Sequence, residues 1–553
     1  MDVRRQPVSV GGRGMNWNPS VTVEGDRDSV WVSASDVEST SPCGQFLSLK
    51  VRRHAYVSGW RRLWAARTVP DRFALKHVRD IVRSLGSPIV HSPSEIGAAI
   101  ARAFDSRPVV RQLRPWVEHA VWNVVDARDS IEATSGPLHL IKSDPEVGQQ
   151  GRSLSVWADV YDGDNGLRQV HRLRVKSAHP AAFDGVDPWS ATAAGIAATI
   201  RGRAAPARIQ VVEIGLLDGS TAVTFDGDVA AAKAAYACYG QPRARALCDA
   251  DHVQASRSCG DCKAAGVCPG LLDLDGFLGQ DSRGVESRAV SPTDLRTYQA
   301  CPAQWMMTAA GVPREDTGSP AADRGRAVHT WLRAAHARGV PCTAADLPST
   351  LGRAMIGTET LNREDYAVAR PFLMRHVGCC PLAAVPSPRV LAIEESLRGY
   401  DHDAEVVVAL APDLVYSDGS SLILREVKTT EMPPGSANEA FDAHLQVPFA
   451  LRALASGLAE HHGFDRGVVE LEVLTVDDAR VWSWSTDDDE TMMLAESQLE
   501  TVAEPWHNDT DWLTTPSPAC TWCPVRRWCL DRDVWANGLG TLPGSGAASA
   551  ATF

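Results

Sequence analysis

The stretch that decides the fold runs from Ala404 to Thr430 and reads AEVVVALAPDLVYSDGSSLILREVKTT. Its first apolar run leads to Asp413, and the Ser-Asp-Gly-Ser sequence that follows is typical of a hairpin turn. A second apolar run then delivers Glu426, Val427 and Lys428. Because residues two apart on a strand point to the same face, Glu426 and Lys428 share one face while Val427 enters the core. The pattern predicts an aspartate and a Glu-x-Lys pair that converge from paired strands.

The composition of the chain bounds its class. With 553 residues it exceeds one ordinary core, so we expect about two to four domains. Apolar residues make up 44% and charged residues 22%, as in a globular protein. We find no run of about 18 apolar residues and no secretory signal, and therefore expect a cytoplasmic protein without membrane contact. The net charge of −13 excludes a generally basic nucleic-acid coat.

Anchors recur in the same order in two parts of the chain. VSASDVESTSPC at Val32–Cys43 matches VSPTDLRTYQAC at Val290–Cys301 in its Val, Ser, Asp and Cys positions. The run Leu154–Lys176 repeats the opening hairpin, so that Asp159 answers Asp413 and Lys176 answers Lys428. A Cys-x2-Cys-x5-Cys triplet closes each part, formed by Cys259, Cys262 and Cys268 and by Cys520, Cys523 and Cys529. The repeat predicts two copies of one α/β domain.

The expected organisation follows from these anchors and from two stretches rich in small and polar residues. It comprises a loosely ordered N-terminus at 1–30, a first copy at 31–275, a linker at 276–288, a second copy at 289–536 and a disordered tail at 537–553.

The second copy contains the groups that phosphodiester hydrolysis needs, namely an activated water and a cation near the phosphate. Asp413 and Glu426 supply carboxylates for Mg or Mn, and the carbonyl of Val427 offers a further ligand. Lys428 can orient or deprotonate the water and offset charge in the transition state. This pattern indicates a metal-dependent phosphodiesterase.

Two helical stretches add to this set. GRAVHTWLRAAH brings His329 to the metal as a nitrogen ligand, and FDAHLQVPFALRALA places Gln446 where it can bind the phosphate or the lysine. Each residue alone also has an ordinary structural explanation, since an Asp at a turn and a Glu-x-Lys cross-strand pair are common. The functional interpretation rests on their combination.

These residues, bracketed by Cys301 and by the triplet Cys520-x2-Cys523-x5-Cys529, resemble the RecB-like branch of the PD-(D/E)xK nucleases, of the restriction-endonuclease-like fold. More narrowly they are similar to its iron-sulphur members, such as the AddB nuclease domain and the four-cysteine CRISPR-adaptation exonucleases. The resemblance implies that Cys301, Cys520, Cys523 and Cys529 hold a 4Fe-4S cluster. Zinc is the alternative metal for such a quartet. One departure is Ala450, where the family often has tyrosine, and Phe449 is a possible substitute.

The first copy lacks part of this set. We align Arg174 with Glu426, which would place a positive charge where the cation binds, and we expect Arg174 to pair with Asp159. Its cysteines are nevertheless kept, which suggests a second 4Fe-4S cluster held by Cys43, Cys259, Cys262 and Cys268. The first copy is therefore expected to be a degenerate domain that preserves the fold.

Basic and aromatic residues interleave in two places, which suits phosphates and unstacked bases. The candidate DNA contacts are Arg52, Arg53, Trp60, Arg61, Arg62, Arg526 and Arg527. The alternative is an ordinary helix with buried tryptophans and solvated arginines.

Together these features predict a Mg- or Mn-dependent deoxyribonuclease. The resemblance implies exonuclease or end-processing activity that prefers single-stranded DNA, in DNA repair, recombination or phage defence. The chain has no P-loop, so processive duplex digestion would need a helicase or other ATPase partner. An RNase or nickase shares the same chemistry. The alternative from another class is a non-catalytic iron-sulphur scaffold subunit that binds DNA within a helicase-nuclease complex.

Overall fold

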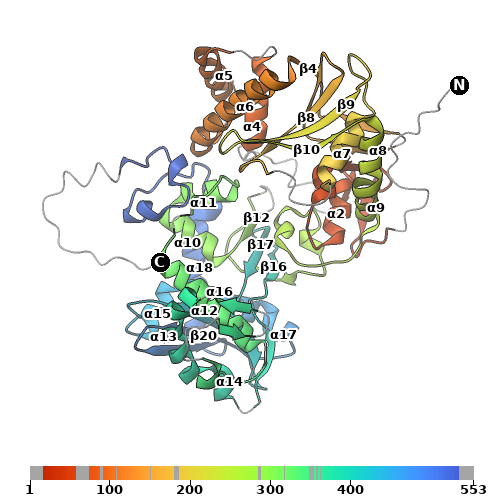
Figure 1. The fold of residues 1–553 in the computed structure, drawn as a ribbon. Helices are drawn as coiled ribbons and strands as arrows, with labels where there is room; N and C mark the ends of the chain where they lie inside the picture. Colours follow the sequence, from red (N-terminus) through yellow and green to blue (C-terminus); the bar gives the residue numbers. More distant parts are fainter. Residues whose placement is uncertain are drawn as a thin grey trace.

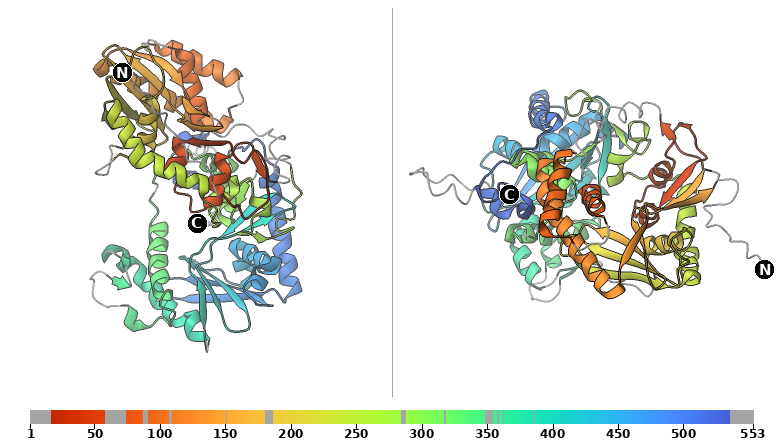
Figure 2. Two further views of the ribbon diagram at one scale, coloured as in Figure 1. Left: turned by 90° about the vertical axis from the view of Figure 1, so that its right-hand side faces the viewer. Right: turned by 90° about the horizontal axis from the view of Figure 1, so that it is seen from above.

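A computed structural model gives the architecture of the protein, which is a mixed α/β fold with several sheets flanked by helices (Figure 1). It describes residues 17–534, apart from 58–73, 87–90, 107–108, 150, 180–185, 284–287, 317, 348–353, 357–358, 362 and 386. The N-terminal part forms one lobe, and most of the C-terminal part forms another (Figure 2).

The N-terminal lobe contains a five-stranded sheet in the order β10-β9-β8-β7-β4 and a three-stranded sheet in the order β2-β6-β5. A two-stranded pair, β1-β3, lies beside them. The strands are β1 (Val23–Gly25), β2 (Val30–Ser33), β3 (Ala55–Val57), β4 (Leu138–Ser143), β5 (Glu146–Gln149), β6 (Arg152–Ser155), β7 (Asp159–Gly163), β8 (Leu167–Arg174), β9 (Arg208–Gly215) and β10 (Thr221–Gly227).

The C-terminal lobe contains a five-stranded sheet in the order β15-β18-β19-β20-β21 and a four-stranded sheet in the order β11-β16-β17-β12. The strands are β11 (Leu272–Asp273), β12 (Arg288–Val290), β13 (Ala354–Ile356), β14 (Glu359–Leu361), β15 (Arg389–Ala392), β16 (Leu397–Asp401), β17 (Val406–Leu410), β18 (Leu414–Ser417), β19 (Leu422–Thr429), β20 (Gly467–Leu474) and β21 (Ala479–Ser485).

The two five-stranded sheets share one pairing pattern. In the first, β4/β7, β7/β8 and β9/β10 are antiparallel and β8/β9 is parallel. In the second, β15/β18, β18/β19 and β20/β21 are antiparallel and β19/β20 is parallel. The smaller sheets also agree, because β2 pairs with β6 and β12 with β17 in parallel. The repeat of sequence anchors is thus matched by a repeat of strand order.

Helices flank both sets of sheets (Figure 1). In the N-terminal part they are α1 (Ala34–Glu38), α2 (Gly44–Val51), α4 (Ala74–Leu85), α5 (Pro93–Ser106), η1 (Arg111–Leu113), α6 (Arg114–Ser135), α7 (Pro188–Ala197), α8 (Val229–Ala235), η2 (Tyr236–Gly240), α9 (Gln241–Asp249), η3 (Arg257–Asp261) and η4 (Ala265–Val267).

In the C-terminal part the helices are α10 (Pro292–Ala300), α11 (Pro302–Ala309), α12 (Pro320–His336), η5 (Ala344–Asp346), α13 (Arg363–Cys379), α14 (Pro381–Ala384), α15 (Ala437–Ala443), α16 (Gln446–Ala453), η6 (Leu454–Leu458), α17 (Ala459–His461), α18 (Asp489–Asn508), η7 (Pro518–Trp522) and η8 (Arg526–Trp528).

The matching Val-Ser-x-x-Asp segments fold alike for a local reason. Ser33 caps α1 and Ser291 caps α10, each through a capping box with the aspartate three residues later. Such a box satisfies amide groups that have no partner within the helix. The same short polar pattern therefore starts a helix after a strand in both halves.

The two halves pack against each other through their cysteine segments. Trp528 of η8 stacks edge-on against Trp116 of α6, with ring centroids 4.9 Å apart. Conversely, Cys259 and Cys262 lie in one apolar cluster with Tyr400 of the C-terminal sheet. Each cysteine segment thus contacts the other half as well as its own.

Two expected irregular stretches contain ordered elements. In the N-terminal stretch, Val23–Gly25 forms strand β1, and Trp17 is buried. In the stretch expected to link the domains, Phe277 packs edge-on against Phe449 of α16, and the amide of Leu278 donates to Asp401. The expected tail at 537–553 lies outside the described residues. None of the helices described is long and apolar enough to span a membrane.

Candidate active site

The hairpin predicted from the sequence is formed by β18 and β19. Gly419 lies at its turn with a φ of +93°, a conformation that favours glycine. Leu414 pairs with Arg425 in the antiparallel ladder. Continuing this register by one residue places Asp413 opposite Glu426, so the strand pairing brings the two predicted carboxylates together.

Asp413 is tied to the neighbouring strand through the backbone. The amide of Val427 donates a hydrogen bond of 2.7 Å to Oδ2 of Asp413. The N–H and C=O of one strand residue point to the same side, so the carbonyl of Val427 also faces Asp413. The Val427 side chain is buried in an apolar cluster with Trp331 and Leu332 of α12. The backbone of Val427 therefore binds Asp413 at the site, while its side chain packs in the core.

His329 reaches the site from α12. Its Nδ1 lies 3.0 Å from Oδ1 of Asp413 and 3.8 Å from Oε1 of Glu394. Burial lowers the pKa of His329, but the hydrogen bond and charge of Asp413 outweigh burial and raise the pKa overall. Asp413 thus favours the protonated form of His329.

Lys428 and Glu426 form the second pair of the site. Nζ of Lys428 lies 2.9 Å from Oε2 of Glu426. Burial raises the pKa of Glu426, although Lys428 opposes this shift. Burial would lower the pKa of Lys428, but the charges of Glu426 and Asp413 outweigh it and raise the pKa. The ammonium group stands beside the carboxylate where a cation would be held.

Glu394 is a member of the site that sequence reasoning missed. His329, Glu394 and Asp413 each offer one donor atom, and these atoms lie within 4.8 Å of one another. Glu394 follows β15 in a connection where its φ is +49°, a conformation that sequence does not reveal. Carboxylate oxygens and one imidazole fit a small divalent cation such as Mg or Mn. The residues present therefore fit the expected metal.

A cavity of about 760 Å³ opens beside this group. His329, Lys428 and Gln446 line it together. The Oε1 atom of Gln446 is buried, and within the described part of the chain it has no hydrogen-bond partner. Buried amide oxygens normally have a partner, so this atom is free to bind a ligand in the cavity. Gln446 thus lies at the same cavity as His329 and Lys428.

The cavity also carries cationic and aromatic side chains. Arg296, Arg526 and Arg532 line it, and so does Trp522, which is 54% exposed. Arg296 and Trp522 were not singled out from the sequence, because α10 and η7 come together only in the fold. Arg527, the other predicted contact of this segment, is exposed and lies over the ring of Trp528.

The four cysteines of the C-terminal quartet, Cys301, Cys520, Cys523 and Cys529, line the same cavity. Cys301 ends α10, and the other three lie in and beside the short helices η7 and η8. Burial and the neighbouring cysteines, Cys301 first among them, raise the pKa of Cys523 to about 11. The amide of Ser517 donates to the sulfur of Cys520 at 3.4 Å. The fold thus brings together cysteines far apart in sequence.

The N-terminal quartet is assembled in the same way. Burial and the neighbouring cysteines Cys268, Cys259 and Cys43 raise the pKa of Cys262 to about 12. Its triplet also spans two short helices, η3 and η4, and the amide of Ser256 donates to the sulfur of Cys259 at 3.3 Å. The two quartets share one local architecture.

The alignment of the N-terminal hairpin requires a correction. Asp159 pairs with His171 across the ladder between β7 and β8, so His171, not Arg174, lies opposite the aspartate. Two residues further, Leu173 takes the position of Lys428 that we assigned to Lys176. The sequence alignment was wrong because it placed Lys176 on the strand as the equivalent of Lys428. In the structure β8 ends at Arg174, two residues before Lys176.

The predicted ion pair between Asp159 and Arg174 is also wrong. Asp159 pairs with Arg83 of α4 at 2.5 Å, whereas Arg174 lies 3.6 Å from Glu213 and 3.7 Å from Glu38. Burial lowers the pKa of His171 to about 3, so its imidazole is neutral. The carboxylate of Asp159 is thus paired with an arginine, whose positive charge repels a divalent cation.

Of the predicted N-terminal DNA contacts, Arg52 does not fit its position. Its side chain is buried and donates to the carbonyls of Ser48, Cys248 and Arg27. Because its guanidinium donates to three backbone carbonyls, Arg52 stabilises the fold and cannot bind a phosphate. Arg53 lies over Trp31, with 5.6 Å from its guanidinium carbon to the ring centroid. Trp60, Arg61 and Arg62 lie outside the described residues.

Comparison with known families agrees with this site. Residues 289–530 match the family model of the PD-(D/E)XK nuclease superfamily, whose members are typically metal-dependent nucleases. The match includes the described acidic group, Lys428 and all four cysteines of the C-terminal quartet. No curated protein matches the chain. The C-terminal part is therefore similar to a nuclease domain and is expected to bind DNA.

The acidic group makes a prediction for metal binding. Asp413→Asn should weaken Mn²⁺ binding by at least about tenfold, because it removes a charged ligand from the group. The matched control is Asp159→Asn in the N-terminal hairpin, where Arg83 already occupies the carboxylate. Isothermal titration with Mn²⁺ measures both. A larger effect of Asp159→Asn than of Asp413→Asn would contradict the assignment.

Proposed function

We propose that the protein is a Mg- or Mn-dependent deoxyribonuclease whose C-terminal part hydrolyses phosphodiester bonds. The observation that carries this proposal is the position of His329, which contacts Asp413 at 3.0 Å and lines one cavity together with Lys428. A purely structural hairpin has no need of a half-buried lysine paired with a buried glutamate, because removing charges from water costs free energy.

Each residue has a distinct task in this proposal. Asp413 and His329 would hold the metal together with Glu394, and Glu426 and the carbonyl of Val427 would complete its ligands. The cation supplies positive charge to the phosphate and lowers the pKa of a water molecule. Lys428 orients the attacking water and balances the charge that develops on the phosphate. The amide nitrogen of Gln446 donates to the phosphate, or its unpaired Oε1 accepts from Lys428.

The cavity favours a single strand or a DNA end as substrate. Arg296, Arg526 and Arg532 offer guanidinium groups for phosphates, and the exposed ring of Trp522 offers a surface on which an unpaired base can stack. With a net charge of −13, the rest of the chain does not attract DNA, so these local groups carry the contact.

The N-terminal part is proposed to be a degenerate copy of the same PD-(D/E)xK domain. The support is the common strand order of the two five-stranded sheets and the common architecture of the two cysteine segments. His171 and Leu173 stand where Glu426 and Lys428 stand in the other copy, so this copy keeps the scaffold without the catalytic groups.

Each quartet of cysteines is proposed to hold a 4Fe-4S cluster. A single zinc ion needs its four donors close together, with sulfur about 2.3 Å from the metal. In the described residues, the groups whose donor atoms lie within 4.8 Å of one another include neither quartet. The four cysteine ligands of each 4Fe-4S cluster would join the two ends of the domain.

Repair, recombination or phage defence are the processes in which such an enzyme would act. A helicase or other ATPase would have to supply unwound DNA for processive digestion, because the sequence has no P-loop.

Lys428→Ala should lower the cleavage rate by about 10²–10³-fold, because it removes a charge that stabilises the transition state. The assay uses Mn²⁺ with end-labelled single-stranded and double-stranded DNA. Lys176→Ala, at the exposed lysine that follows the N-terminal hairpin, is the matched control and should leave the rate unchanged.

Two outcomes would count against this site. Equal rates for wild type and Lys428→Ala would refute the role of the lysine. Failure of every form to cleave linear DNA, circular single strands and RNA would favour the non-catalytic scaffold instead.

Iron analysis after anaerobic purification tests the clusters. The chain should contain about eight irons, and Cys301→Ser should remove about half of them. Cys238→Ser is the control, since Cys238 is exposed and outside both quartets. Zinc in both quartets, or an iron content unchanged by Cys301→Ser, would overturn the assignment.

A further inference from the structure

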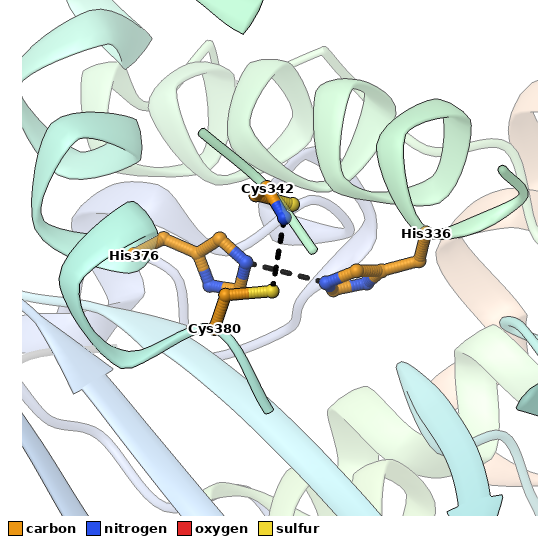
Figure 3. Close-up of side chains that lie close together, drawn as sticks. All are labelled: His336, Cys342, His376 and Cys380. Carbon is orange, nitrogen blue, oxygen red and sulfur yellow. Dashed lines mark hydrogen bonds between the residues drawn. The ribbon is translucent and has the colours of Figure 1, made fainter. Parts of the chain in front are cut away.

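A third group of metal-ligand residues lies in the C-terminal part, away from both cysteine quartets. It consists of His336, Cys342, His376 and Cys380, none of which the candidate active site uses (Figure 3). One donor atom from each residue lies within 4.8 Å of the other three. Figure 3 shows the four side chains turned toward one another.

All four residues are buried, with exposed fractions between 0% and 4%. The Nε2 atoms of His336 and His376 are 3.2 Å apart, and the amide of Cys342 donates to the sulfur of Cys380 at 3.4 Å. A tetrahedral zinc ion with two sulfur and two nitrogen ligands requires donor separations of about 3.3–3.8 Å. The separation of the two imidazole nitrogens is close to this range, and all four donor atoms lie within 4.8 Å of one another, so a small closure of the group would complete the tetrahedron.

The surroundings of His376 provide an independent argument. Its Nδ1 donates to Oε1 of Glu472 at 2.8 Å, and Nε of Arg425 donates to the other oxygen of that carboxylate at 2.9 Å. A carboxylate that takes the proton of one ring nitrogen fixes the histidine so that its other nitrogen offers a lone pair. In His376 that nitrogen is Nε2, which points at His336. This orientation is what a metal ligand needs.

We propose that His336, Cys342, His376 and Cys380 form a structural zinc site. Two thiolates and two neutral imidazoles around Zn²⁺ make a complex without net charge, which suits a fully buried position. All four positions of the tetrahedron are taken by protein, so the site is closed and structural. A competing group, His376 with Cys379 and Glu472, offers three donors only, and its carboxylate is already bound by Arg425.

The location of this site links it to the candidate active site. His336 is the last residue of α12 and lies seven residues after His329, about two helical turns. His376 lies in the last turn of α13, and Cys380 precedes α14. Zinc would therefore fasten the end of α12 to α13, while Asp413 holds the same helix at His329. The zinc site would fix the helix that delivers a ligand to the catalytic metal.

Zinc analysis and X-ray absorption at the zinc edge test the proposal on the purified full chain. We expect one zinc per chain with two sulfur and two nitrogen neighbours. Cys342→Ser and Cys380→Ser should each lose this zinc and lower the melting temperature. Cys379→Ser is the matched control, because Cys379 adjoins Cys380 without belonging to the group, and it should keep the zinc.

The absorption spectrum of the wild type keeps the test decisive even if the serine variants fail to fold. Zinc bound only by sulfur would place it in the cysteine quartets and overturn the proposal. Absence of zinc, or a Cys342–Cys380 disulfide, would do the same. Loss of zinc from Cys379→Ser together with retention in Cys342→Ser would assign the metal to the competing group.

Discussion

The structure depends on the register of one strand, β19. It pairs antiparallel with β18 on one side and parallel with β20 on the other. A slip of one residue would exchange its faces, burying Lys428 and exposing Val427. The hydrogen bond from the Val427 amide to Asp413 and the burial of the Val427 side chain against α12 fix this register from two directions. The same packing brings His329 to Asp413, so the core and the site are determined together.

The two halves share a strand order but differ at the position of the candidate site. Both halves retain the strand order, the capped helix after the first strand and the cysteine segments. The two halves differ in a few side chains at the hairpin. In the N-terminal half, His171 lies opposite Asp159, and Leu173 follows it two residues later on the same strand. Arg83 contacts Asp159, whereas His329 contacts Asp413 in the C-terminal half. Retention of the fold is explained by packing, because each cysteine segment contacts the other half.

Local patterns predicted the parts of the site that lie on single elements. The hairpin, Asp413, Glu426 and Lys428 follow from strand periodicity and a turn signal, and in the structure Lys428 contacts Glu426 while His329 contacts Asp413. Glu394 could not be predicted, because its role depends on a connection with positive φ that brings it to α12.

Burial and long-range assembly account for the other differences. The basic and aromatic pattern around Arg52 suggested DNA contact, but carbonyl groups from distant segments enclose its guanidinium. Likewise, His336 and Cys380 have no recognisable spacing in sequence, because α12 and α13 meet only through tertiary packing. The alignment of the two hairpins was also wrong in register. It matched Lys176 with Lys428, although the strand pairing places Leu173 at that position.

The most direct measurement is a crystal structure of the full chain with Mn²⁺, using anomalous scattering to locate the metal. The account predicts a manganese peak within bonding distance of Asp413 and Glu426, and none at Asp159. A peak at Asp159, or a well-ordered Asp413 with no metal at saturating Mn²⁺, would contradict it.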